Sequence, residues 1–192
     1  MDVFSHGVWA LAIARGADIK TNTRVMRPAV AFFFGIFPDL FAFSIPILSV
    51  VWAMLSGDGP DMAAAPGPGP SSLRSPEMLT LAHGLYNLSH SLIVFLLVFI
   101  VVALLRKKRP YWELSGWLFH ILCDIPTHSG EFFPTPIFWP LADWKFDGFS
   151  WGQPWFIIAN WTTLILVHLG LTLWKRSKQK ADSSYAPPQA TS

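Results

Sequence analysis

The sequence predicts an all-α, multi-pass transmembrane helical bundle, with four spanning helices plus a short N-terminal membrane-inserted helix. Hydrophobic residues make up 52% of the 192 residues and charged residues only 14%. Mean hydropathy is +0.40, and this composition is unusual for a soluble domain. The apolar residues also fall in long runs, each near the ~17 to 25 residues that a spanning helix needs.

Four long apolar runs predict the four spans, at roughly residues 28 to 55, 83 to 105, 111 to 128 and 154 to 174. Pro38 and Pro46 interrupt the first run and Pro126 the third, so kinks or broken helices are expected there. Residues 3 to 14 are too few to cross ~30 Å of hydrocarbon at ~1.5 Å per residue. A short, tilted or re-entrant helix and an interfacial helix both stay open for this segment.

Two polar segments delimit the predicted transmembrane domain, which covers residues 1 to 175. Residues 56 to 76 are rich in proline and glycine and predict a flexible loop within that domain. Residues 176 to 192 are polar and predict a disordered tail.

Lysine and arginine gather in three clusters, which the positive-inside rule places on the cytoplasmic side. The clusters lie at residues 15 to 27, 106 to 109 and 175 to 180. The two other loops are poor in lysine and arginine and are predicted to face outward, so the C-terminus is expected in the cytoplasm. Membrane lipids are the expected partners, no nucleic-acid partner is expected, and the oligomeric state stays open.

Five polar residues lie inside or beside the apolar runs, where an unpaired carboxylate or imidazole costs at least ~2.5 kcal/mol. His120 and Asp124 are one helical turn apart and project from the same face. The helical rise places Asp39 ~18 Å from the inner end of its run and His90 ~10 Å from the outer end of the next. His6 falls at a similar level, and this convergence predicts one shared intramembrane metal site.

Nitrogen and oxygen atoms must supply the ligands, because Cys123 is the single cysteine and excludes a cage of several thiolates. Such ligands suit a divalent metal: zinc first, with manganese or iron also suitable. Asp2, His83 and His128 are possible additional ligands. Each polar group also has a simpler role open to it: a hydrogen bond to a neighbouring helix, a helix cap at Asp2, or an outer-surface position for His83.

Five short motifs occur in one order along most of residues 1 to 175. They are Ser5-His6, Phe37-Pro38-Asp39-Leu40, Ser89-His90-Ser91-Leu92, His120-x3-Asp124-x2-Thr127-x2-Gly130 and Trp139-Pro140-Leu141. In these motifs the chain resembles the YdjM-like family of bacterial inner-membrane proteins, described as LexA-regulated, membrane-bound metal-dependent hydrolases. The family usually has threonine before the first and third of these sites, where this chain has Ser5 and Ser89, and that change keeps the hydroxyl.

The resemblance implies a bacterial inner-membrane protein whose metal ligands are His6, Asp39, His90, His120 and Asp124. His120 and Asp124 are the expected catalytic pair. Ser5, Ser89 and Thr127 are expected to orient the ligands through hydrogen bonds. A lipid or lipid-linked phosphoester or ester near the outer leaflet is the expected substrate.

Two other classes of function fit the same residues. In a small transporter or a proton- or ion-translocating protein, the buried histidines and aspartates relay protons or bind a cation. In a structural membrane protein they fix helix packing without catalysis.

Overall fold

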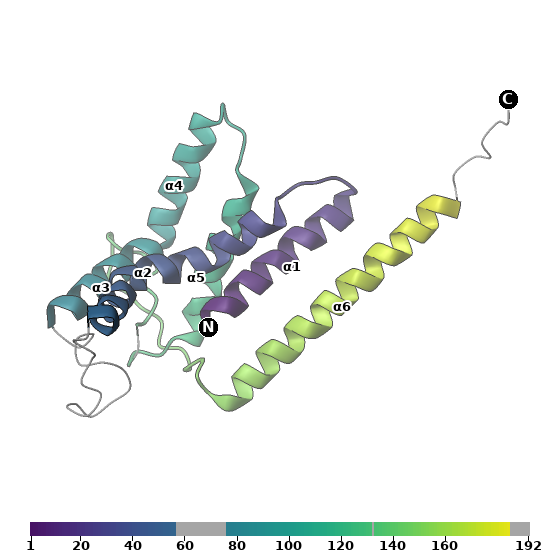
Figure 1. Ribbon diagram of the computed structural model, residues 1–192. Coiled ribbons are helices and arrows are strands. Elements are labelled where there is room, and N and C mark those ends of the chain that lie inside the picture. The colour runs from purple at the N-terminus through teal and green to yellow at the C-terminus, as the bar shows by residue number, and fades with distance from the viewer. Residues whose placement is uncertain (57–75, 132, 185–192) are drawn as a thin grey trace.

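The computed structural model is all-helical (Figure 1) and describes residues 1–56, 76–131 and 133–184. Its helices are α1 (Val3–Thr21), α2 (Pro28–Ser56), α3 (Pro76–Ser89), α4 (Leu92–Leu105), the short 3-10 helix η2 (Trp112–Leu114), α5 (Ser115–Thr127) and α6 (Pro154–Ser184). The predicted loop at 56 to 76 falls almost wholly outside the described residues, as do residues 185–192 of the predicted tail.

Two helices are long and apolar enough to cross a membrane, α2 and α6, and α3 with α4 adds a third if this bent pair is one span. The prediction of four spans is therefore not met within the described ranges. The difference lies in the run at 111 to 128, where α5 has 13 residues and is only ~20 Å long. Burial inside protein and burial in lipid select the same apolar residues, so the sequence pattern alone does not separate a short core helix from a span.

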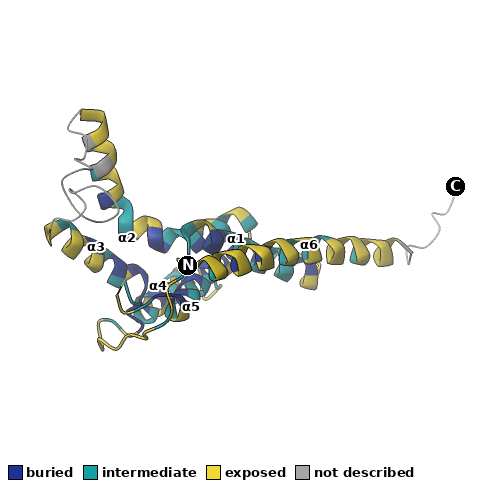
Figure 2. Ribbon diagram, turned by 90° about the horizontal axis from the view of Figure 1, so that it is seen from below, coloured by how far each residue is buried: buried dark blue, intermediate teal, exposed yellow. Residues whose placement is uncertain are grey.

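The run at 83 to 105 is broken, whereas the sequence predicted one helix there. The break falls at His90, and the axes of α3 and α4 differ by 54°. Ser91 starts α4 as its N-cap, because its hydroxyl accepts hydrogen bonds from the backbone N–H groups of Ile93 (3.1 Å) and Val94 (3.3 Å). In contrast, α2 is one helix through Pro38 and Pro46, although Figure 2 shows its C-terminal part turning away from the rest.

Glycines allow α1, α2 and α5 to cross closely. A Cβ atom added to Gly35 on α2 would lie 2.7 Å from the backbone oxygen of His6 and 2.9 Å from Cβ of Ala10, both on α1. Gly7 on α1 and Gly116 on α5 are equally crowded by α2. Small residues at such crossings let helix backbones approach in membranes, and this crossing brings the three helices that carry the candidate site together.

Helix α6 lies along α1 (Figure 1) and makes few other contacts. Only 11% of the most apolar 18-residue stretch of α6 is buried inside the protein. Figure 2 shows mainly exposed residues along this helix. Trp9 Nε1 donates to Asn160 Oδ1 at 2.9 Å and ties the two helices together. The helix runs on to Ser184, so residues 176–184 are helical and not the disordered tail that was predicted, because added turns extend a helix that the apolar part has already nucleated.

The three basic clusters meet on one side of the molecule. The guanidinium groups of Arg27 and Arg106 lie 5.5 and 4.8 Å from the ring centre of Tyr111. Lys178 Nζ donates to the carbonyl oxygens of Ile19 (2.9 Å) and Lys20 (3.2 Å). The positive-inside rule requires the basic clusters to share one side of the molecule, as they do here. That this side faces the cytoplasm stays a prediction.

Candidate metal centre

Four of the predicted ligands converge on one point in the core. Asp39 comes from α2, His90 from the break between α3 and α4, and His120 and Asp124 from one face of α5. One nitrogen or oxygen atom of each lies within 4.8 Å of the others. The side chains are buried, with exposed fractions of 6% for Asp39 and 0% for the other three.

The distances within this group fit a small metal ion. The Nε2 atoms of His90 and His120 are 3.0 Å apart. From His90 Nε2, Asp39 Oδ1 lies at 3.4 Å and Asp124 Oδ2 at 3.5 Å; from His120 Nε2, the same oxygens lie at 3.6 and 3.2 Å. Bonds of ~2.0 to 2.2 Å in a tetrahedral zinc site place ligand atoms roughly 3.3 to 3.6 Å apart.

The other nitrogen of each ring determines which atom faces the group. His120 Nδ1 lies 2.6 Å from the backbone oxygen of Gly35, and His90 Nδ1 lies 3.2 Å from that of Tyr86. A carbonyl oxygen only accepts, so Nδ1 carries the proton in both neutral rings and Nε2 is left with a lone pair. Two lone pairs and two carboxylate oxygens therefore face one another, and a cation satisfies all four.

Asp124 faces two ways. Its Oδ2 points to the four-residue group and makes no hydrogen bond within the described part of the chain. Its Oδ1 lies 2.7 Å from the Met1 amine, 2.9 Å from His6 Nε2 and 3.8 Å from His128 Nε2. The predicted ligand His6 thus stands on the far side of Asp124, with its ring stacked 3.7 Å from that of His120.

The three residues predicted to orient the ligands differ in their contacts. Ser89 Oγ lies 2.9 Å from His90 Nδ1, as expected for an orienting group. Thr127 Oγ1 lies 3.2 Å from the Met1 amine and donates to the carbonyl of Cys123. The Ser5 hydroxyl bonds the carbonyl of Asp2 at 3.0 Å, so it serves the helix start and not a ligand ring.

Of the three possible additional ligands, one lies beside the group of four and two do not. Asp2 is the N-cap of α1 and accepts from the Ser5 N–H at 3.0 Å. His83 is exposed and stacks on Phe133 at 4.3 Å. His128 lies beside the group, and its Nδ1 is 2.8 Å from the Tyr86 hydroxyl.

Tyr86 and the Met1 amine are neighbours of the site that sequence reasoning missed. The Tyr86 ring stacks 3.7 Å from that of His90, and the spacing of four residues between them was a signal that could have found it. No sequence pattern pointed to the amine.

Comparison with known proteins gives a family. A family model described as "YdjM inner membrane protein" matches residues 1–187. Chitin synthase 5 of Cryptococcus neoformans var. grubii serotype A is 24% identical over 116 residues, which cover 52% of this chain and 6% of that protein. No solved structure matches the chain. Because the family match covers nearly the whole chain, the chain belongs to the YdjM inner membrane protein family.

Proposed function

We propose that this protein is a membrane-embedded metal-dependent hydrolase that acts on a lipid or a lipid-linked phosphoester or ester. Asp39, His90, His120 and Asp124 would hold a divalent ion, with zinc favoured by the nitrogen and oxygen donors and manganese or iron also suitable. The observation that carries the proposal is the convergence of two ring lone pairs and two carboxylate oxygens, in which each Nε2 atom lies 3.0 to 3.6 Å from the other three atoms.

A divalent ion would supply Lewis acidity, polarising a phosphoryl or acyl oxygen and activating water for attack. The chain supplies the groups around it. His6 is placed to handle a proton, because its ring is fully buried beside the group of four and contacts Asp124. Its Nε2 lies 2.9 Å from Asp124 Oδ1, so that carboxylate oxygen can stabilise the imidazolium formed when His6 takes up a proton. The same pair could instead contribute to a second ion.

The position of the site supports a lipid-like substrate. Apolar side chains on α4 and α6 are exposed, Leu97 by 62% and Leu166 by 62%, which suits contact with lipid tails. His6 and Lys20 lie about 21 Å apart along α1 at ~1.5 Å per residue. If the basic clusters face the cytoplasm, the metal centre lies toward the outer leaflet.

Elemental analysis of the full chain purified in detergent tests the metal centre. We expect one or two divalent ions per chain in the wild type and a loss of the ion in His120→Ala and Asp124→Ala. His83→Ala is the matched control, because it removes an exposed histidine outside the group and should keep the ion. A wild type without a stoichiometric ion, with its helical circular dichroism intact, would refute the metal site.

Activity needs its own measurement. The zinc-loaded protein in vesicles of phosphatidylglycerol should release a headgroup or acyl product that mass spectrometry detects, and Asp124→Ala should not. A metal-loaded protein that releases no product from this lipid or from a panel of lipid-linked phosphoesters would contradict the hydrolase.

A structural metal site is the second candidate. All four donors belong to the protein and are buried, and closed four-ligand sites are typical of structural zinc, whereas catalytic zinc keeps one position open. In that case chelation lowers the thermal unfolding midpoint strongly while no product forms with any lipid.

A further inference from the structure

A basic cleft lies at the far end of α1 from the metal centre. It is enclosed by the last turns of α1, the residues that follow them and the end of α6, and its volume is about 480 Å³. This is within the ~300 to 1,000 Å³ of typical small-ligand sites. Four cationic side chains line it: Arg15, Arg24, Lys175 and Lys178.

The cationic charges in the cleft are not neutralised by ion pairs. Arg15 is bound by neutral partners, since its Nη1 lies 2.8 Å from His168 Nδ1 and its Nη2 donates to Thr172 Oγ1 at 3.2 Å. Lys178 is held by two backbone carbonyls. Within residues 1–56, 76–131 and 133–184, none of the four cations forms an ion pair with a carboxylate.

Two aspartates also line the cleft, Asp18 and Asp182. The first is engaged in holding the turn after α1, where Asp18 Oδ1 accepts from the backbone N–H groups of Val25 (2.7 Å) and Met26 (3.3 Å). Four positive and two negative groups therefore leave the cleft with an excess of positive charge.

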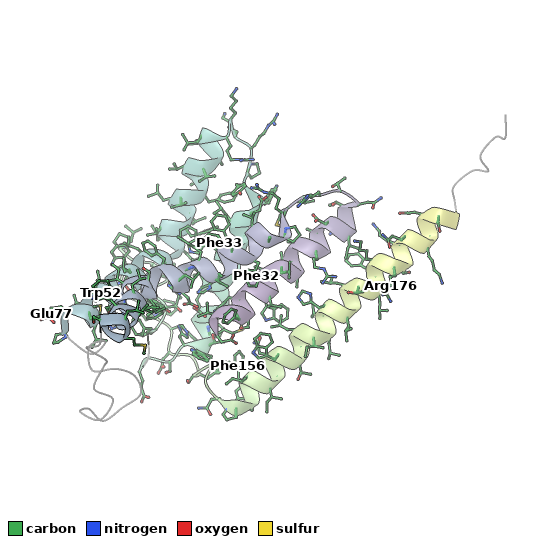
Figure 3. All side chains as sticks on the ribbon, viewed as in Figure 1. Phe32, Phe33, Trp52, Glu77, Phe156 and Arg176 are labelled. Carbon is green, nitrogen blue, oxygen red and sulfur yellow. The ribbon has the colours of Figure 1, made fainter. Side chains whose placement is uncertain are left out.

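If α6 crosses a bilayer, the cleft opens at the level of the lipid headgroups. The apolar part of α6 runs from Pro154 to Trp174, about 31 Å at ~1.5 Å per residue, which matches the ~30 Å of bilayer hydrocarbon. Lys175 follows directly, and Figure 3 shows Arg176 on α6 far from Phe156 near its start. A basic site at this depth meets the phosphates of the bilayer before any other anion.

We propose that the cleft binds the phosphate headgroup of an anionic phospholipid. Guanidinium and ammonium groups recognise phosphate through charge-assisted hydrogen bonds. The exposed Arg24 and Lys175 would contact the headgroup, while Arg15 fixes the wall formed by α1 and α6. The inference does not depend on the metal centre, because His6 and Arg15 lie about 13 Å apart along α1.

Native mass spectrometry of the full chain in detergent, titrated with phosphatidylglycerol or with phosphatidylcholine, tests the proposal. The wild type should bind phosphatidylglycerol more tightly, and Arg24→Gln with Lys175→Gln should weaken that binding roughly thirtyfold, from about fivefold for each cation. Lys20→Gln with Lys180→Gln is the matched control, because it removes the same charge from side chains that do not line the cleft. The control pair should stay within about threefold of the wild type.

The possible outcomes decide the proposal. An equal loss of phosphatidylglycerol affinity in the two double variants would show that general surface charge, and not the cleft, attracts the lipid. That result would overturn the proposal. Equal binding of the two lipids would overturn it as well. A third arm adds inorganic phosphate: displacement of phosphatidylglycerol at equal concentration would show a site for free phosphate and overturn the assignment to lipid.

Discussion

The Nε2 atoms of His90 and His120 lie 3.0 Å apart, although each ring directs its Nδ1 toward a backbone carbonyl oxygen. Two neutral rings in this arrangement oppose their lone pairs, and the nearby carboxylates of Asp39 and Asp124 add negative charge. In a low-dielectric core such a group is stable only with positive charge among its members.

Ser89→Ala should weaken zinc binding by roughly 10- to 100-fold, because groups that orient a ligand ring contribute about that much to metal affinity. Ser89 Oγ lies 2.9 Å from His90 Nδ1. Competition with a zinc-binding dye measures the effect. Ser89→Thr keeps the hydroxyl and should restore the affinity, and Ser44→Ala, at a serine that bonds within its own helix, should not change it. Unchanged zinc affinity in Ser89→Ala would remove the orienting role.

Gly35→Ala should destabilise the fold by about 1 to 3 kcal/mol, the usual cost of an overpacked site. The added methyl group would meet the His6 carbonyl at 2.7 Å and push α1 away from α2. The thermal unfolding midpoint in detergent and the zinc content per chain should both fall. Gly84→Ala is the control, since nothing lies within 4 Å of its added Cβ, and it should gain up to ~1 kcal/mol of helix propensity. Equal unfolding midpoints for Gly35→Ala and Gly84→Ala would contradict the close crossing of α1 and α2.

The pair of Glu113 and Arg27 should make stability depend on acid pH. Burial alone would raise the pKa of Glu113, but hydrogen bonds from the Arg27 side chain (3.0 Å) and backbone (3.3 Å) outweigh it, and the pKa lies below its ordinary value of 4.5. The stabilisation is therefore present above that value and lost as the pH falls through the lower folded-state pKa.

The unfolding midpoints of wild type and Glu113→Gln, compared between neutral pH and about pH 3, measure this dependence. The wild type should unfold at the higher temperature at neutral pH, and the difference should shrink toward the acid end. Glu77→Gln, at an exposed glutamate, should match the wild type throughout. If the midpoints of wild type and Glu113→Gln differed by the same amount at every pH, the result would contradict a stabilising ion pair.

Asn160→Ala should loosen α6 from α1. The change removes the acceptor of Trp9 Nε1, and hydrogen bonds between membrane helices contribute about 0.6 kcal/mol on average and up to ~1.7. The unfolding midpoint in detergent should fall accordingly. Thr163→Ala lies on the same helix but only removes a bond to the carbonyl of Ala159, so it should change the midpoint less. The reverse order would mean that the hydrogen bond from Trp9 to Asn160 does not help to hold α6 against α1.

Much of the candidate site could be predicted from the sequence, because charge in an apolar segment is expensive and therefore rare. His120 and Asp124 were marked by their spacing of one turn, and Asp39 and His90 by depth along their runs. The structure brings these four together. Their role in binding an ion and in catalysis stays a prediction, and His6 lies beside Asp124 and not in the group of four.

The rest depended on contacts between distant segments, which no local pattern records. Directly after the break at His90, the backbone N–H of Leu92 donates to the distant carbonyl of Ile137 at 3.0 Å, whereas local rules pointed to the prolines of α2. The carbonyl partner of His120 is Gly35, and any residue type could have supplied that oxygen. The run at 111 to 128 was predicted as one span, but α5 has only 13 residues of it, because an apolar run does not show where a helix begins.

The donors of the candidate site come from segments far apart along the chain, Asp39 on α2 and both His120 and Asp124 on α5. During synthesis, α2 leaves the ribosome long before α5, so an aspartate stands alone in the nascent protein while its counterparts are still untranslated. If these residues bind a metal ion, the ion can be held by all of them only after α5 has been synthesised. On that proposal, cells short of the ion would accumulate a complete but unfilled chain.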